Sequence, residues 1–239
     1  MLHDNALIIN GKSTADLSFL VAVEENDAVR YAKRKDKVFE EERVTGYLKQ
    51  SIEAYEGIKK SYKLWCKTDS KKELRKLKAM LSEEGWFTPS DEPDLRYYYI
   101  SLDTEWEVLD EVMGYPVTLV FYCQPFGMET PQVQAMTNGH KLTNYTNAPM
   151  FPLIKVTGKT TSETFVQIGE QKMYLKELQE GQPVFIECTP GKQDAYTNGK
   201  QLLNERVRGN FFIVHPGDHI VNFGEGITNL EITCRWGWR

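Results

Sequence analysis

The sequence has little that would place the chain in a membrane or hold it with disulfides. Its longest largely apolar stretch, Val117–Cys123, is far shorter than the ~20 residues that span a bilayer, so we expect no transmembrane helix and no membrane partner. Residues 1–5 lack a basic segment followed by an apolar run, so we expect no secretory signal and synthesis in a cytoplasm. The four cysteines lie at least 46 residues apart. This excludes CxxC pairs and predicts reduced, mostly buried thiols.

The charge balance is mildly acidic. Lys and Arg number 29 against 34 Asp and Glu, a net charge of −5. Such a chain offers no cationic field to gather phosphates by counterion release, so we expect no specific nucleic-acid partner. At 239 residues and 41% hydrophobic composition, the chain can bury a core and has the length of one to two domains; we expect two modest ones.

Strings that mark common catalytic sites are missing. The sequence contains no GxSxG, no P-loop and no HExxH. His215 and His219 flank a Pro-Gly turn, and we interpret them as two polar residues of a hairpin because a metal site needs three or four ligands. Gly224–Gly226 indicates a hairpin turn, since a nucleotide loop needs a third glycine and a βαβ context.

Two acidic pairs, Asp91 with Asp94 and Asp103 with Glu105, have the residue types of a glycosidase acid and base. Nothing in the sequence places either pair in a cleft, and solvated surface explains them. We therefore assign no catalytic, cofactor-binding or metal-binding residue and predict that the protein is not an enzyme. A hydrolase whose site leaves no motif stays as an alternative, to be tested by turnover on cell-wall substrates.

The first half predicts a helix packed on a sheet. Three leucines recur at helical spacing between Ser70 and Glu84: Leu74, Leu77 and Leu81. Ser70 is the expected N-cap, with Glu73 as its capping-box partner, and Gly85 stands where a left-handed C-terminal residue is needed.

Strands are expected around this helix. Ala6–Ile9, ending at Asn10-Gly11, and Phe19–Val23 resemble the two strands of a hairpin. Two or three strands fit Val38–Thr68, and two more fit the apolar and aromatic segments Leu95–Leu102 and Tyr115–Cys123.

Residues 24–37 are charged and have no sustained apolar period, which indicates a mobile loop or an arm that projects from the body. Four cations between Lys33 and Lys37 are followed at once by Glu40, Glu41 and Glu42. Such a dipolar arm could pair head to tail with a copy of itself in a contact that closes into a ring. An ordinary solvated loop is the other interpretation.

Pro125, Gly127 and Pro131 interrupt the chain within seven residues and mark the expected boundary between domains 1–130 and 131–239. Beyond it, apolar segments recur every 8 to 12 residues or so and are separated by turn signals, a pattern typical of an antiparallel β-sandwich. The segments are Phe151–Val156, Phe165–Ile168, Met173–Leu175, Val184–Cys188, Phe211–Val214, His219–Phe223 and Leu230–Trp236. The fold class is therefore mainly β, with an α+β N-terminal domain.

The last six residues hold two tryptophans and two arginines, which are enriched where proteins meet and also suit stacking on sugar rings. A terminal strand whose tryptophans face inward would look the same.

Several segments, in their order along nearly the whole chain, resemble the distal tail protein (Dit) of long-tailed, non-contractile bacteriophages. They are Asn10-Gly11 followed by Ala15-Asp16-Leu17, Tyr62–Trp65 before the helix, Trp86 with Pro93–Tyr99, Val120–Gly127, Asn147-Ala148-Pro149, Phe212–Gly217 with His219-Ile220, and Leu230–Trp236. The family often has Asn at the position of His219, a difference that affects only the chemistry of the turn there.

The resemblance implies an N-terminal domain that assembles into a homohexameric ring and a C-terminal sandwich of galectin-like type that faces outward. It implies a structural hub at the distal end of the virion tail, assembled in the host bacterial cytoplasm. The implied partners are other copies of the chain, the major tail tube protein, the tail-associated lysin or tip protein, the tape measure protein that passes the bore, and a receptor-binding protein.

A carbohydrate-binding module is the alternative function. Its β-sandwich would stack cell-wall sugars on exposed aromatic side chains, for which Tyr145, Tyr196, Trp236 and Trp238 are the candidates.

Overall fold

The computed structural model describes residues 6–26, 30–52, 54–107, 114–199 and 201–239. These residues form two compact units, Met1–Met128 with Arg239 and Glu129–Trp238, here called the N-terminal and C-terminal units. The fold is mainly β, as the sequence predicts, and each unit has its own hydrophobic core.

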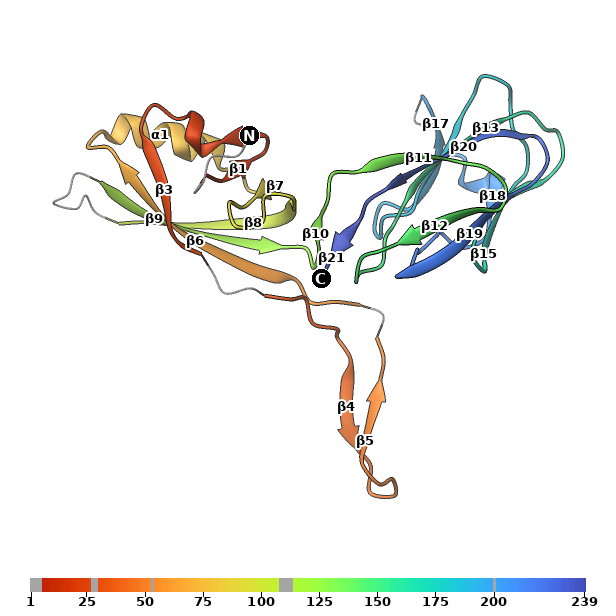
Figure 1. Ribbon diagram of the computed structural model, residues 1–239, viewed down its shortest axis with the longest axis horizontal. Coiled ribbons are helices and arrows are strands. Elements are labelled where there is room, and N and C mark those ends of the chain that lie inside the picture. Colours follow the sequence, from red (N-terminus) through yellow and green to blue (C-terminus); the bar gives the residue numbers. More distant parts are fainter. Residues whose placement is uncertain (1–5, 27–29, 53, 108–113, 200) are drawn as a thin grey trace. The chain divides into compact units, whose positions relative to one another are not determined.

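The N-terminal unit is built on a seven-stranded antiparallel sheet in the order β2-β1-β7-β8-β9-β6-β3 (Figure 1). The strands are β1 Ile8–Ile9, β2 Lys12–Ser13, β3 Leu20–Asn26, β6 Ile58–Lys67, β7 Gly85–Thr88, β8 Tyr97–Trp106 and β9 Tyr115–Cys123. A 3-10 turn, η1 at Thr14–Asp16, follows β2, and helix α1, Lys71–Met80, follows β6. Strand β10 is Gly127–Met128.

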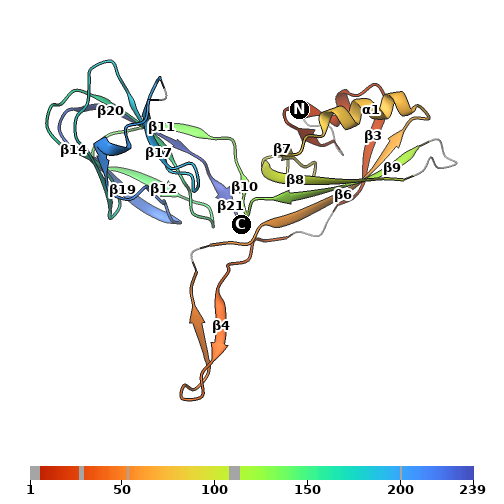
Figure 2. The same cartoon turned by 180° about the vertical axis from the view of Figure 1, so that it is seen from behind.

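Helix α1 lies over one face of this sheet (Figures 1 and 2) and buries Leu74 and Leu77 against it. The same face carries an aromatic core in which the rings of Phe87 and Phe121 stack with centroids 4.0 Å apart. Strand β6 shows why the sheet forms, because its residues alternate between buried and more exposed positions along its whole length.

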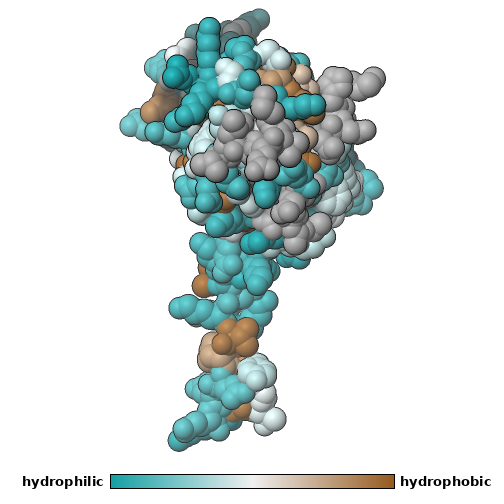
Figure 3. Space-filling model, turned by 90° about the vertical axis from the view of Figure 1, so that its left-hand side faces the viewer, coloured by the Kyte–Doolittle hydropathy of each residue, from teal (hydrophilic) through white to brown (hydrophobic). Residues whose placement is uncertain are grey.

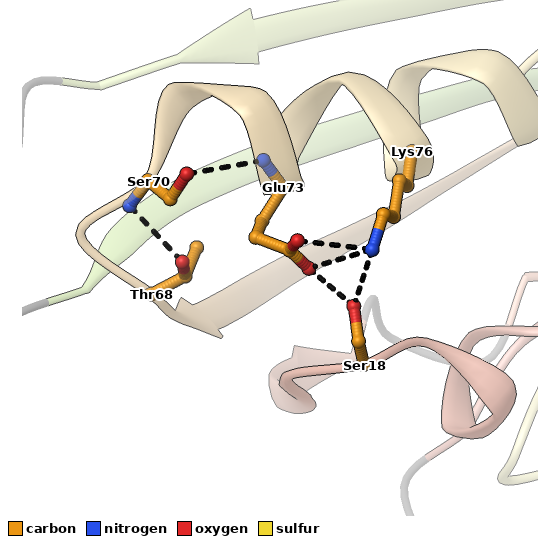
Figure 4. A network of polar contacts seen from close by, with 5 residues as sticks. All are labelled: Ser18, Thr68, Ser70, Glu73 and Lys76. Carbon is orange, nitrogen blue, oxygen red and sulfur yellow. Dashed lines mark hydrogen bonds and ion pairs between the residues drawn. The ribbon is translucent and has the colours of Figure 1, made fainter.

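The helix starts as predicted and ends earlier. The Ser70 hydroxyl accepts a hydrogen bond from the Glu73 amide at 3.4 Å. The predicted return bond of the capping box, from the Ser70 amide to the Glu73 carboxylate, is wrong. The Ser70 amide donates to Thr68 Oγ1, and the Glu73 carboxylate binds Ser18 and Lys76 (Figure 4). Gly85 is not the helix C-cap either, since it begins strand β7 opposite Tyr99.

The predicted hairpin of Ala6–Ile9 with Phe19–Val23 is wrong. The turn at Asn10-Gly11, where φ is 50° and 79°, returns the chain at once so that β1 pairs with β2. Strand β3 instead pairs with β6 at the opposite edge of the sheet. A two-residue turn with both φ angles positive closes the tightest hairpin, which leaves Phe19–Val23 free to pair elsewhere.

Between β3 and β6 the chain forms a separate hairpin of β4, Lys37–Glu40, and β5, Tyr47–Gln50. Both views show it leading away from the sheet of the N-terminal unit (Figures 1 and 2). Together with β6, it confirms the strands expected within Val38–Thr68.

The C-terminal unit consists of two five-stranded antiparallel sheets that enclose one core. The first has the order β11-β20-β13-β16-β17 and the second β12-β19-β14-β15-β18. Their bounds are β11 Gln132–Met136, β12 His140–Asn144, β13 Leu153–Gly158, β14 Thr164–Ile168, β15 Gln171–Leu175, β16 Val184–Glu187, β17 Asp194–Thr197, β18 Val207–Arg208, β19 Gly217–Phe223 and β20 Ile227–Cys234. A 3-10 turn, η2, spans Asn204–Arg206, and β21 is Gly237–Trp238.

Two sequence expectations for this unit need correction. Phe211–Val214 is not a strand: it makes one isolated bridge, Met150 to Val214, although Phe212 and Val214 are fully buried. Gly224–Gly226 is not a hairpin turn, because it joins β19 and β20, which belong to opposite sheets. Glycine is needed there since Gly226 has a φ of 82° and a Cβ on it would lie 2.7 Å from Thr160.

Candidate functional site: an exposed hairpin arm

The hairpin and its base, residues 30–56 apart from residue 53, form what we call the arm. Its two strands pair Lys37 with Gln50, Val38 with Lys49, Phe39 with Leu48 and Glu40 with Tyr47. Directly opposed residues share a face of an antiparallel pair. Phe39 and Leu48 therefore lie on one face, and Val38 and Tyr47 on the other.

The arm exposes apolar side chains on both faces. Tyr47 is 75% exposed and Val38 62%, and Phe39 and Val44 are also exposed. Figure 3 shows this segment from the side, with hydrophobic residues among hydrophilic ones along its length. A two-stranded hairpin gains little stability alone, and clustered apolar residues on a surface mark interaction sites. The arm therefore has the character of a contact surface.

The base of the arm is organised around one carboxylate, that of Asp36. It accepts hydrogen bonds from the Ile52 amide at 3.0 Å and from Ser51 Oγ at 3.3 Å, and it pairs with Lys49 Nζ at 2.6 Å and Arg34 Nε at 3.5 Å. Lys49, the Ile52 amide and Arg34 lower the pKa of Asp36 below its usual value. The carboxylate thus ties both strands of the arm together.

The arm is joined to the core of its unit at its root. Backbone bonds run from the Lys35 amide to Ala54 O at 2.9 Å and from the Glu56 amide to Lys33 O at 2.8 Å. Ala32 is 4% exposed and belongs to the core of the N-terminal unit. The described arm is therefore a paired extension with a packed root. Of residues 24–37, for which the sequence allowed either a mobile loop or an arm, residues 24–26 belong to β3, residues 27–29 lie outside the described residues, and residues 30–37 form one side of the arm.

Charge is divided along the arm. The cations Lys33, Arg34, Lys35 and Lys37 lie toward the root, whereas Glu40, Glu41 and Glu42 lie at the turn end. Arg34 is engaged with Asp36 and Ser51. The turn itself is closed by a bond from the Val44 amide to Glu41 O at 3.0 Å. An acidic, partly apolar tip is the result.

The aromatic residues suggested for sugar stacking divide between core and surface. Trp236 is 1% exposed and belongs to the core of the C-terminal unit, so its expected role as an exposed stacking platform is wrong. The alternation after β20 explains this, because Cys234 and Trp236 both point inward. Trp238 is half-buried, and its Nε1 donates to Glu129 Oε1 at 2.6 Å.

Tyr145 and Tyr196 keep accessible surface. Tyr145 is 51% exposed and donates to Glu129 Oε2 at 2.5 Å. Burial of the hydroxyl and the Glu129 carboxylate raise the pKa of Tyr145 to about 12. Tyr196 stacks on Phe185 with centroids 5.5 Å apart and an angle of 14° between the rings.

Beside that aromatic pair lies an ion pair that sequence reasoning missed. Arg235 donates to both oxygens of Glu187 at 2.6 and 2.8 Å and also to Thr189 Oγ1. Burial raises the pKa of Glu187, but the bonds from Arg235 and Thr189 outweigh it, so the pKa stays below its usual value. No sequence signal joins two residues 48 positions apart.

The remaining sequence candidates do not gather into a catalytic site. His219 Nε2 lies 2.7 Å from His215 O, but the predicted hairpin is wrong, because His219 lies within β19, which pairs with β12 and β14 and not with the segment before it. Asp103 accepts from the Tyr122 hydroxyl at 2.8 Å and Asp91 from the Tyr62 hydroxyl at 3.4 Å. Within the described part of the chain, no group of His, Cys, Asp or Glu is placed to hold a metal.

The four cysteines are buried and unpaired, as the sequence predicts. Burial raises the pKa of each thiol to about 12. Among the described residues, no helix is both long enough and apolar enough to cross a bilayer.

Comparison with known proteins finds a similar fold among solved structures and no match among family models or curated proteins. No family model matches the chain, and no curated protein matches it. Among solved structures, it is similar to the crystal structure of the Dit protein (gp 19.1) of SPP1, described as a paradigm of the hub adsorption apparatus in phages that infect Gram-positive bacteria. The TM-score is 0.75 at 16% identity, over 95% of this chain and 97% of that one.

The sequence indicated a resemblance to Dit proteins, and the structural similarity confirms that resemblance for the fold. The chain has the fold of a Dit protein over nearly its whole length.

Proposed function

We propose that this protein is a structural hub of a phage tail, in which six copies form a ring that connects the tail tube to the adsorption apparatus at the tail tip. The observation that carries the proposal is the Dit fold, shared over 95% of the chain with a protein described as a hub. The exposed arm adds a contact surface of the kind that such an assembly needs.

In this proposal, residues 1–130 form the ring and residues 131–239 form an outward-facing sandwich of galectin-like type. The arm contacts the neighbouring copy, because its exposed Val38, Phe39 and Tyr47 lose contact with water only when another surface covers them. The bore passes the tape measure protein and then DNA. The partners are the major tail tube protein on one side and the tail-associated lysin or tip protein on the other, with a receptor-binding protein in the same apparatus.

The proposed protein is a virion component of the distal tail, assembled in the cytoplasm of the host bacterium, and it has no catalytic role. The hub description of the structure it is similar to supports this.

The experiment that tests the proposal replaces the hairpin between Lys37 and Gln50 by a short Asn-Gly turn. Because Asp36 and Ser51 flank the replaced segment, a two-residue turn can close the gap. We expect the ring to be lost while the shortened chain stays folded, as measured by light scattering and circular dichroism. If the shortened chain forms rings as the unaltered chain does, the role of the arm is refuted.

A second candidate function rests on the Phe185–Tyr196 pair beside the Glu187–Arg235 ion pair. A flat aromatic surface next to paired hydrogen-bonding groups suits a sugar ring. Binding to host cell-wall polysaccharide that is lost in Tyr196→Ala and kept in Tyr31→Ala would support it. Tyr31 is a matched control because it is exposed and lies in the other unit.

A further inference from the structure

One side of helix α1 carries cations that have no partner within the described residues. Lys71, Arg75 and Lys78 stand at positions i, i+4 and i+7, which share one face of a helix. Lys76, by contrast, is held by Glu73 at 2.9 Å and by Ser18 at 2.8 Å (Figure 4). Lys71, Arg75 and Lys78, which lack such a partner in the described part of the chain, therefore lie on a different side of the helix from Lys76.

These three cations surround a shallow apolar groove. Its lining consists of Lys71, Leu74, Arg75 and Lys78 from α1 and Trp106 from the end of β8, and its volume is about 110 Å³. For scale, a cavity of ~150 Å³ holds a benzene molecule. The groove, which we call the α1 groove, has the size for one aliphatic side chain and a rim of positive charge.

The tip of the arm has the complementary chemistry. Glu40, Glu41 and Glu42 precede Arg43 and the exposed Val44. The tip thus offers one branched apolar side chain beside three carboxylates and one cation. An apolar anchor with charges of the opposite sign around it is what the α1 groove would recognise.

The two surfaces lie toward opposite ends of the N-terminal unit. The arm joins the sheet where β6 begins, at Ile58, whereas Trp106 pairs with Val117, the residue opposite Leu64. At ~3.3 Å per residue, the six residues from Ile58 to Leu64 span about 20 Å, and the hairpin leads further away from the sheet (Figures 1 and 2). The tip of an arm is therefore too far away to reach the α1 groove of its own chain, and a tip that binds this groove must belong to another copy.

We propose that the arm tip, Glu40–Val44, docks into the α1 groove of the next copy, with Val44 against Leu74 and Trp106 and the glutamates against Lys71, Arg75 and Lys78. This inference rests on the proposed ring and adds the surface that receives the arm. Because tip and groove are different patches on one chain, the contact is head to tail, the type that closes into rings.

Reciprocal charge reversal tests the pairing. We expect the double variant E41K/E42K to raise the concentration needed for assembly by about tenfold or more, and K71E/R75E/K78E to do the same. Combining both sets in one chain restores assembly, because the interacting charges are again opposite. The control E170K/E180K makes the same change of charge on exposed residues of the C-terminal unit and leaves assembly unchanged.

A cross-link locates the contact without depending on a stable ring. Val44 is replaced by photoreactive benzoylphenylalanine in a full-length chain, which is mixed with heavy-nitrogen-labelled wild-type protein and irradiated. We expect cross-linked peptides that join the tip of the light chain to the segment around Leu74 or Trp106 of the heavy chain.

The outcomes separate this inference from the ring itself. The docking of the tip would be overturned by cross-links to other segments or by cross-links within one copy. It would also be overturned if no cross-link formed at the highest soluble concentration. Charge variants that assemble like wild type would overturn it too, while wild-type rings would leave the hub proposal intact. A wild-type chain that forms no ring yet gives the expected cross-link would count against the hub and for the docking.

Discussion

The ring of Tyr55, at the root of the arm, meets the ring of Phe126 edge-on, with centroids 5.0 Å apart and an angle of 70° between the planes. Tyr55 also packs against the core of the N-terminal unit, and its backbone bridges to Arg34 on the opposite strand of the arm. This contact holds the arm at its root, so that its tip is presented from a fixed base.

Loss of this contact should loosen the arm without unfolding the unit. Aromatic pairs contribute about 0.5 to 1.5 kcal/mol beyond their burial, so we expect Tyr55→Ala to speed hydrogen exchange at the Lys35 and Glu56 amides and to weaken assembly. Exchange measured by mass spectrometry checks this. Tyr31→Ala, a change at an exposed tyrosine of the same unit, should leave both amides as in wild type, and an equal effect of the two variants would contradict the assignment.

Protonation of Asp36 should open the arm in acid. Its folded-state pKa is lowered below the usual 3.8, so its stabilising effect is present above pH 3.8 or so and is lost as the pH falls through the folded pKa. We expect Asp36→Asn to reduce protection of the Ile52 amide at neutral pH and to match wild type at low pH.

The control for this prediction is Asp218→Asn, which removes a similarly paired carboxylate from the C-terminal unit. It should leave the arm amides unchanged at every pH. Protection of Ile52 that is independent of pH in the wild-type chain would show that Asp36 does not hold the arm.

Removal of the helix's central core residue should destabilise the N-terminal unit. Leu77 is fully buried, and truncation of such a leucine costs about 2 to 5 kcal/mol. In urea unfolding followed by tryptophan fluorescence, Leu77→Ala should lower the free energy of unfolding of this unit by that amount. Leu20→Ala, at a side chain that is 60% exposed, should change it by less than about 0.5 kcal/mol.

All four thiols should be inert in the folded chain. Each has its pKa raised to about 12 by burial, so hardly any thiolate is present at pH 8. We expect no alkylation by iodoacetamide in native protein and four modifications after unfolding in guanidinium, counted by intact mass. A thiol that reacts in the native state would mean that its surroundings open.

Local patterns in the sequence predict much of this fold. The leucine spacing and Ser70 predict α1 because a helix is stabilised by residues three and four apart. The recurring short apolar segments predict the sandwich for a similar reason, since the alternation of buried and exposed side chains is a local property of each strand. Strand β1 pairs with β7, and β3 with β6, although dozens of residues separate the partners in the sequence. No local pattern encodes which of these distant strands pair.

Local patterns in the sequence predict only part of the candidate site. The charges of the arm and the i, i+4, i+7 cations of α1 are visible in the sequence. Val38 and Tyr47, however, have the pattern of an ordinary half-buried strand, and only the structure shows that they are exposed. Trp106 joins the α1 groove from a strand that follows the helix by more than a dozen residues, so the groove itself could not be predicted.

The mass of the purified 239-residue chain in solution shows whether six copies form a ring. It is measured by light scattering after size exclusion, with the main peak imaged in negative stain. We predict a species near six times the 27.6 kDa of one chain, seen as round particles with a central hole. A protein that stays at 27.6 kDa up to its highest soluble concentration, or that assembles without a central hole, would show that the chain is not a ring-forming hub.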